Sequence, residues 1–119
     1  RRRFLREELR EFEDALELGN LVGAVDALLD LVYVAYGTAV IMGVPWPADW
    51  AHVQQANLAK IRAAADGSNS KRGSAFDVVK PAGWKAPDLK IFRTLLEHGW
   101  EQDAEHTFDE AGRCVGIAR

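Results

Sequence analysis

The chain has 119 residues, enough for one domain with a core of its own, and its formal net charge of −3 provides no basic field for double-stranded nucleic acid. Its single cysteine, Cys114, excludes an intrachain disulfide and forms no recognisable zinc spacing with the three histidines. No secretory signal is visible, so we expect a cytoplasmic protein that binds neither a nucleic acid duplex nor a membrane.

Apolar residues recur at helical spacing near the start of the chain and predict a first helix over residues 2–18, ending near Gly19-Asn20. This helix also carries three glutamates at spacings of three and four positions, which place them on one face: Glu7, Glu8 and Glu11. Taken alone, these glutamates are best explained as a solvated helix face.

A second helix is predicted over residues 21–42 and is apolar on most of its circumference, which indicates a buried, central element of a bundle. Asp26 and Asp30 interrupt it at a spacing of four, so both carboxylates lie on one face. Burying them without a partner is costly, and their charge disfavours the alternative of a membrane span. We therefore expect a divalent cation, and oxygen ligands favour Mg²⁺, with Mn²⁺ as the alternative.

The rest of the chain predicts shorter elements. A third helix is expected with Pro47 in its first turn and an end near Ala64, followed by a mobile, glycine-rich loop over residues 66–74. Residues 76–80 suit a short strand or an extended segment, and Asp88 opens a fourth helix that runs to His98. The tail over residues 100–119 is open to two interpretations: two short strands joined by a turn, or a segment that wraps a partner.

Several motifs occur in a fixed order along residues 6–89. They read Glu7-Glu8-x-x-Glu11, Asp26-x-x-x-Asp30-Leu-x-Tyr33-Val-x-Tyr36-Gly, Val53-x-x-Ala56-Asn57-x-x-Lys60 and Lys80-Pro-x-Gly-Trp84-x-x-Pro87-Asp88-Leu89. In this combination the chain resembles the MazG-like all-α nucleoside triphosphate pyrophosphohydrolases, specifically the branch of the phosphoribosyl-ATP pyrophosphohydrolases.

The resemblance implies an all-α, four-helix bundle-like fold in a single domain over residues 1–119, with an irregular or β extension at 100–119. It also implies a homodimer or homotetramer. The implied activity is hydrolysis of a (deoxy)nucleoside triphosphate between its α and β phosphates, giving a monophosphate and pyrophosphate. Two alternatives stay open: a phosphoribosyl-ATP pyrophosphohydrolase, and a catalytically degenerate helical interaction protein.

The resemblance also implies roles for the acidic residues. Glu8, Glu11 and Asp30 match metal ligands, and Glu7 is the catalytic candidate, either orienting the nucleophile or adding a ligand. The family's glutamate three positions before Asp30 is replaced by Ala27, and Asp26 is the nearest substitute as a fourth ligand.

Substrate contacts are predicted for Asn57, Lys60 and Lys80, with Lys71 and Arg72 closing a loop over the triphosphate. An exposed lysine by itself is more often a surface residue than a ligand contact. Five aromatic residues are candidates to stack on a base, with core packing favoured for Tyr36 and Trp50: Tyr33, Tyr36, Trp46, Trp50 and Trp84.

Overall fold

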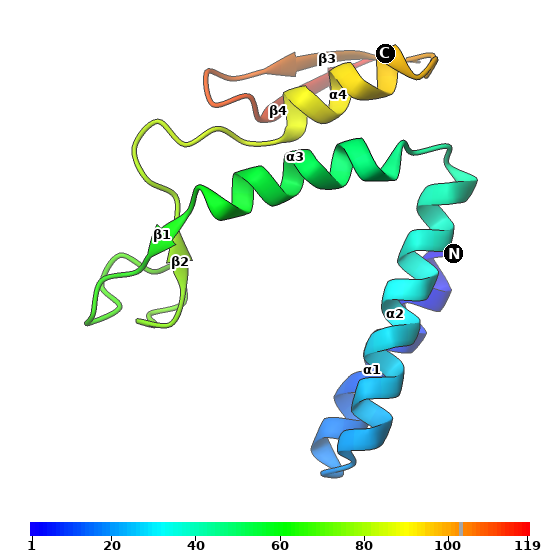
Figure 1. Cartoon of the computed structure of the whole chain (residues 1–119), viewed down its shortest axis with the longest axis vertical. Helices are drawn as coiled ribbons and strands as arrows, with labels where there is room; N and C mark the ends of the chain where they lie inside the picture. Colours follow the sequence, from blue (N-terminus) through cyan, green and yellow to red (C-terminus); the bar gives the residue numbers. More distant parts are fainter. Residues whose placement is uncertain (103) are drawn as a thin grey trace. The chain divides into compact units, whose positions relative to one another are not determined.

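A computed structural model describes residues 1–102 and 104–119. The chain divides into two compact units, Arg1–Val44 and Pro45–Arg119, and each is described by itself (Figure 1). The described residues form four helices, which make up about half of the chain, and two small antiparallel sheets. The four predicted helices are therefore confirmed, whereas a single bundle-like domain over residues 1–119 stays a prediction.

The first unit is a helical hairpin of α1 (Arg2–Glu17) and α2 (Leu21–Ile41) (Figure 1). The connection turns at Gly19, whose φ of 67° is a conformation that glycine adopts without strain. Asn20 then caps α2, because its side-chain oxygen accepts a 3.0 Å hydrogen bond from the backbone N–H of Gly23. Both predicted helices are confirmed to within one residue at each end.

Helix α2 is mostly exposed in this chain. Its buried residues are Ala24, Ala27 and Ala39, whose small side chains allow close helix packing. The prediction that α2 is buried is therefore wrong for the single chain. Its neighbour α1 covers one side of α2 and leaves the apolar residues on the other sides exposed. By length and composition alone α2 is also apolar enough to cross a membrane, a property that core helices and signal sequences share.

The second unit begins with α3 (Trp46–Leu58), which has Pro47 in its first turn as predicted. The predicted end near Ala64 is wrong, because the chain leaves the helix at Ala59 and enters strand β1 (Ile61–Arg62). Strand β1 pairs with β2 (Val78–Val79), so its backbone groups bond across the sheet instead of along a helix. Strand β2 confirms the short strand predicted within residues 76–80.

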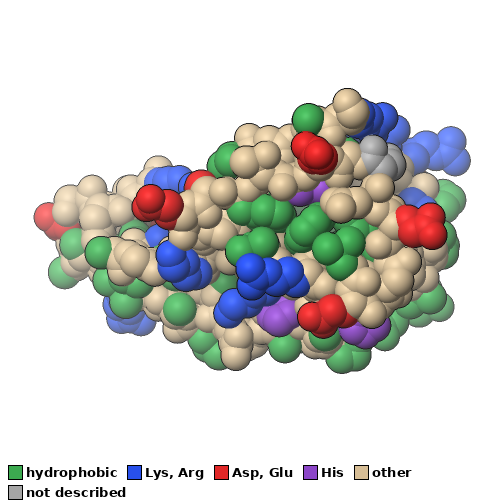
Figure 2. All heavy atoms as spheres, turned by 90° about the horizontal axis from the view of Figure 1, so that it is seen from above, with side chains coloured by type: hydrophobic (Ala, Val, Ile, Leu, Met, Phe, Trp, Pro, Cys, Tyr) green, Lys and Arg blue, Asp and Glu red, His purple; other side chains and the backbone are tan. Residues whose placement is uncertain are grey.

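Helix α4 (Asp88–Glu97) starts at the predicted residue and is followed by a C-terminal hairpin of β3 (Glu105–Phe108) and β4 (Cys114–Ala118). The hairpin joins the start of α4 through hydrogen bonds from Leu89 N–H to the Gly112 carbonyl and from Cys114 N–H to Asp88 Oδ2. Phe92 of α4 contacts the rings of three residues near the hairpin: Trp100, His106 and Phe108. On the face shown in Figure 2, hydrophobic side chains are exposed on the surface between charged and histidine side chains.

Residues 63–77 join β1 to β2 as a loop of successive turns, and the mobility predicted for residues 66–74 stays a prediction. Asn69 Oδ1 accepts a 2.7 Å hydrogen bond from Ala64 N–H, and turns close at Gly67, Ser70 and Gly73. Gly67 is buried with a φ of 72°, and a Cβ built there would lie 2.7 Å from the Gly73 carbonyl oxygen. The polar side chains thus bond to the loop's own backbone, which gives the loop a defined structure.

Gly67→Ala should destabilise the protein more than Gly73→Ala. Both positions have positive φ, so each substitution is expected to cost about 1 kcal/mol of backbone strain. At Gly67 the added Cβ would also collide with backbone, whereas the space around Gly73 is open. Thermal unfolding of the two variants makes the comparison, and equal losses would show that the loop is not packed at Gly67.

Candidate functional site

The first unit carries an acidic face shared by α1 and α2. Glu8 is half-buried, and its Oε2 atom is shielded from solvent without a hydrogen-bond partner. Burial raises the pKa of Glu8, and the neighbouring carboxylates raise it further, in the order Glu11, Asp30, Glu7 and Asp26. The other four predicted acidic residues therefore lie close enough to repel the carboxylate of Glu8.

The sequence predicts that Asp26 and Asp30 carry the free-energy cost of burying a carboxylate, but in the structure Glu8 carries it. Asp26 and Asp30 were expected to be buried in an apolar helix, but both side chains are exposed in the chain. The reason is geometric: Ala24 and Ala27 are buried, and the two aspartates lie beside that packed stripe. Glu8 on α1 is instead the carboxylate with a buried, unpartnered oxygen.

The acidic face fits a hard divalent cation in its chemistry. Its donors are all carboxylate oxygens, the ligands that Mg²⁺ and Mn²⁺ prefer, and the orphaned oxygen of Glu8 is the kind of atom that a cation would satisfy. Within residues 1–102 and 104–119, however, no three such side chains are already drawn together closely enough to hold an ion. The side chains would have to converge on binding, and their ligand roles stay predictions.

The second unit contains a basic pocket, a cavity of about 460 Å³ beside the β1–β2 sheet. It is lined by cationic, polar and apolar residues: Lys60, Asn69, Lys71, Arg72, Asp77, Val78, Val79 and Lys80. Two predicted substrate residues, Lys60 and Lys80, therefore share one cavity with both predicted loop cations. Asn57 does not line it but accepts a 2.9 Å hydrogen bond from Lys60 Nζ.

Trp84 holds the two lysines close to each other. The Nζ atoms of Lys80 and Lys60 lie 4.7 Å and 5.7 Å from the centre of its ring, at distances where cation–π attraction operates. The indole is itself fixed by a 2.8 Å hydrogen bond from Nε1–H to the Ala56 carbonyl. Trp84 thus positions cations, a role that the sequence did not predict.

Lys80 experiences the electrostatics of the whole pocket. Burial lowers its pKa, and the positive charges of Arg113, Lys71 and Lys60 lower it further, while Asp88 opposes the shift. After burial, the main causes of the shift are these three cations, so positive charge surrounds this ammonium group. An anion bound in the pocket would relieve that repulsion.

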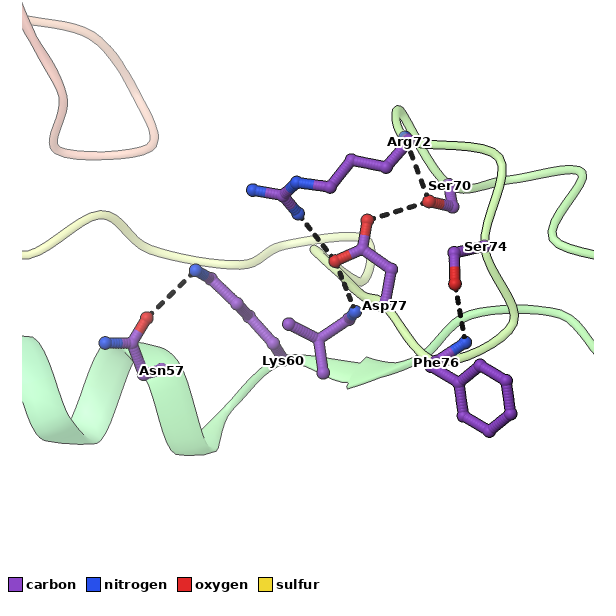
Figure 3. Close-up of polar contacts among 8 residues, drawn as sticks. Asn57, Lys60, Ser70, Arg72, Ser74, Phe76 and Asp77 are labelled. Carbon is purple, nitrogen blue, oxygen red and sulfur yellow. Dashed lines mark hydrogen bonds and ion pairs between the residues drawn. The ribbon is translucent and has the colours of Figure 1, made fainter. Parts of the chain in front are cut away.

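The loop beside the pocket is organised around Asp77 (Figure 3). Its carboxylate accepts hydrogen bonds from Ser70 Oγ at 2.7 Å and from Arg72 Nη1 at 2.6 Å, while Ser74 Oγ accepts one from the Phe76 N–H. Sequence reasoning missed Asp77, since an aspartate in a loop has no periodicity to mark it. The only available signal was its spacing from the predicted loop cations.

The predicted aromatic residues separate into different environments. Trp46 and Trp50 stack on each other with centroids 5.7 Å apart. The prediction that Tyr36 and Trp50 are core residues is wrong, because they are 47% and 54% exposed. Tyr36 belongs to α2, most of whose residues are exposed, and Trp50 stays more than half exposed beside Trp46.

A second residue that sequence reasoning missed is Asp49 in the first turn of α3. The side chain is 7% exposed, and neither carboxylate oxygen has a hydrogen-bond partner within the described structure. Burial raises its pKa, and the nearby His52 and His98 act in the opposite direction. His52 is held by a 2.9 Å hydrogen bond between its Nε2 and Thr94 Oγ1 of α4, so this polar cluster links the two helices.

Comparison with known proteins identifies the part of the chain that carries the acidic face. Residues 1–57 match the family model of phosphoribosyl-ATP pyrophosphohydrolase. This family belongs to the MazG-like all-α nucleoside triphosphate pyrophosphohydrolases, so the resemblance is confirmed over these residues. No curated protein and no solved structure matches the chain significantly.

The matched segment contains all five acidic residues and ends at Asn57, before Lys60. It supports a nucleotide pyrophosphohydrolase-type activity, a hydrolysis of a phosphoric anhydride, and the four helices are consistent with the all-α fold of the family. The resemblance over residues 58–89 stays a prediction.

Glu8→Gln should stabilise the metal-free protein at neutral pH. The folded state raises the pKa of Glu8 above its ordinary value of 4.5, so ionisation costs stability once the pH exceeds that value. The cost disappears as the pH falls from neutral through the raised pKa. The variant should therefore melt higher than wild type near pH 7, and the difference should shrink as the pH falls toward about 4.5 and be lost below it.

Glu13→Gln is the matched control, because Glu13 is an exposed α1 glutamate that does not contribute to the pKa shift of Glu8. Its difference from wild type should not follow the same pH window. Identical pH profiles for the two variants would show that neither burial nor the neighbouring carboxylates raise the pKa of Glu8.

Proposed function

We propose that the protein is a Mg²⁺-dependent nucleotide pyrophosphohydrolase. Water attacks a phosphorus atom of the anhydride that joins the α and β phosphates of a nucleoside triphosphate. The bond to the bridging oxygen breaks, and the products are a nucleoside monophosphate and pyrophosphate. The observation that carries the proposal is the family match over residues 1–57, which contains every residue of the acidic face.

In this proposal Glu8, Glu11, Asp26 and Asp30 hold Mg²⁺, with Mn²⁺ as the alternative. Support comes from the repulsion of Glu8 by the neighbouring carboxylates and from the unpartnered oxygen of Glu8. When bound, such an ion polarises a phosphoryl oxygen and lowers the pKa of an attacking water. Glu7, exposed on α1 beside Glu8, would orient that water or contribute a further ligand.

Lys60 and Lys80 would bind phosphate oxygens, with Asn57 fixing the ammonium group of Lys60. The basic pocket supports this role because it collects four cationic side chains around one carboxylate. Lysine contacts phosphate as a point charge, while the guanidinium of Arg72 can contact two phosphate oxygens at once.

The substrate is proposed as a (deoxy)nucleoside triphosphate, and phosphoribosyl-ATP fits the family match at least as well. A panel of both substrate kinds with Mg²⁺ or Mn²⁺, assayed for pyrophosphate and monophosphate, separates them. Preference for phosphoribosyl-ATP would assign the second activity. Absence of pyrophosphate release from every compound would favour a catalytically degenerate interaction protein.

We also propose that the protein forms a homodimer or homotetramer. The support is the large apolar surface that α2 exposes, which includes Leu28, Leu29 and Val32 at 45%, 63% and 60% exposure. A second copy of the same helix would cover an apolar face of this kind. Sedimentation of the full chain measures the assembly, and a monomer at all concentrations would contradict it.

Asp30→Ala should abolish pyrophosphate release and leave the fold intact. Asp30 is exposed and raises the pKa of Glu8, so its removal relieves repulsion without opening a cavity. Asp14→Ala, at an exposed acidic position on α1, is the control and should retain turnover. Full activity of Asp30→Ala would remove this residue from the site, and a large fall in melting temperature would make its role structural.

Asp26→Asn should weaken Mg²⁺ binding and turnover, whereas Ala27→Glu should not improve either. Ala27 is only 3% exposed, so a glutamate there must bury a carboxylate or force α1 and α2 apart. Calorimetric titration with Mg²⁺ and a pyrophosphate assay test both variants. Tighter Mg²⁺ binding by Ala27→Glu would instead show that the site lacks the family's glutamate and that the hairpin can open to accept it.

A further inference from the structure

The basic pocket has one anionic side chain in its wall, that of Asp77. A carboxylate in the wall of an anion-binding cavity weakens binding by its charge, because the carboxylate repels the anion. Yet Asp77 is the most heavily bonded side chain of the loop. Its carboxylate accepts from Ser70 Oγ and Arg72 Nη1, and Oδ1 also accepts a 2.9 Å hydrogen bond from the Val78 N–H.

These bonds connect Asp77 to both the cations and the backbone of the loop. Ser70 Oγ, which donates to Asp77, also accepts a 3.0 Å hydrogen bond from the backbone N–H of Arg72. The Asp77 carbonyl accepts a 3.0 Å hydrogen bond from the Ala63 N–H, next to β1. One residue therefore fixes the backbone around Arg72 and joins it to the base of the loop.

The two side chains of the Arg72–Asp77 ion pair differ in how far they are exposed to solvent. The Asp77 side chain is 10% exposed, whereas the Arg72 side chain is 77% exposed. Hydrogen bonds from Ser70 and Val78, together with the charge of Arg72, hold the pKa of Asp77 below its ordinary value. The carboxylate is thus ionised and fixed, while the guanidinium that it orients remains accessible to solvent.

We infer that Asp77 is a positioning residue, which holds the 63–77 loop and Arg72 in the arrangement that binds the phosphate chain of a nucleotide. This inference rests on the proposed phosphate-binding function of the same pocket. Asp77 does not touch the ligand in this account. It acts through Arg72 and through the backbone that carries Lys71.

A positioning role for Asp77 predicts that Asp77→Asn changes the affinity for an anion in the opposite direction from the one that loss of a negative charge alone would give. If Asp77 is merely a negative group near an anion site, Asp77→Asn removes repulsion and should tighten anion binding. If Asp77 positions the loop, the same substitution should weaken binding, because Arg72 loses its charged partner. The sign of the change therefore distinguishes the two accounts.

The experiment is calorimetric titration of the full chain with inorganic tripolyphosphate. Asp77→Asn should bind about tenfold more weakly than wild type, since hydrogen bonds to a charged group are lost. Asp66→Asn is the matched control: Asp66 belongs to the same loop, does not line the pocket, and bonds within its own turn to Ser68. It should bind as wild type does.

Ser70→Ala provides a test without any change of charge, and Ser68→Ala is its control. Removing the Ser70 hydroxyl breaks its bonds to Asp77 and to the Arg72 backbone, so binding should weaken. This variant also decides the matter if Asp77→Asn does not fold, which thermal melting reveals. An Arg72→Ala, Asp77→Asn double variant should lose less affinity than the sum of the single losses.

Equal or tighter binding by folded Asp77→Asn, or wild-type binding by Ser70→Ala, would overturn the positioning role and leave the phosphate pocket intact. Additive losses in the double variant would overturn the link through Arg72. A wild-type protein that does not bind tripolyphosphate would instead overturn the phosphate-binding function proposed for the pocket.

Discussion

Close packing of α1 against α2 through alanine is the constraint on which the acidic face depends. Ala15 on α1 and Ala24 and Ala27 on α2 are buried, and side chains this small let the helices approach closely. That approach brings Glu8 near the two aspartates of the opposite helix, where its ionised form is disfavoured. The apolar contact thus supports an arrangement of charges that would otherwise separate, and a bound cation would remove the conflict.

In the second unit the basic pocket brings positive charges together, and they are held by cation–π contacts and an ion pair. Lys60 and Lys80 lie over the face of Trp84, and Arg72 pairs with Asp77, so three of the four pocket cations have a partner that keeps them near their neighbours. A repelling set of like charges is held in place only where packing or hydrogen bonds oppose the repulsion. The loop composition, rich in serine, asparagine and glycine, supplies those hydrogen bonds without bulk.

The sequence predicts local features well because they depend on neighbouring residues. The bounds of α1, α2 and α4 follow from apolar spacing and from glycines beyond the helix ends, and the acidic cluster follows from the spacing of its residues. It does not predict features that depend on distant contacts. The early end of α3 requires the pairing of Ile61 with Val79, and the exposure of α2 depends on how many elements pack against it. Asp77 is identified only by its bonds.

The position of the family match indicates how the chemistry is divided along the chain. The matched residues 1–57 include all five carboxylates of the acidic face, which are proposed to hold the cation and orient the water. The cations and the folded loop that line the basic pocket come after the matched residues in the chain. Cation binding and bond cleavage depend on oxygen donors, whereas the choice of substrate depends on the shape and charge of the surrounding loop. The substrate preference of this protein is therefore expected to reside in residues 58–89, where the match has ended and the structure supplies the pocket.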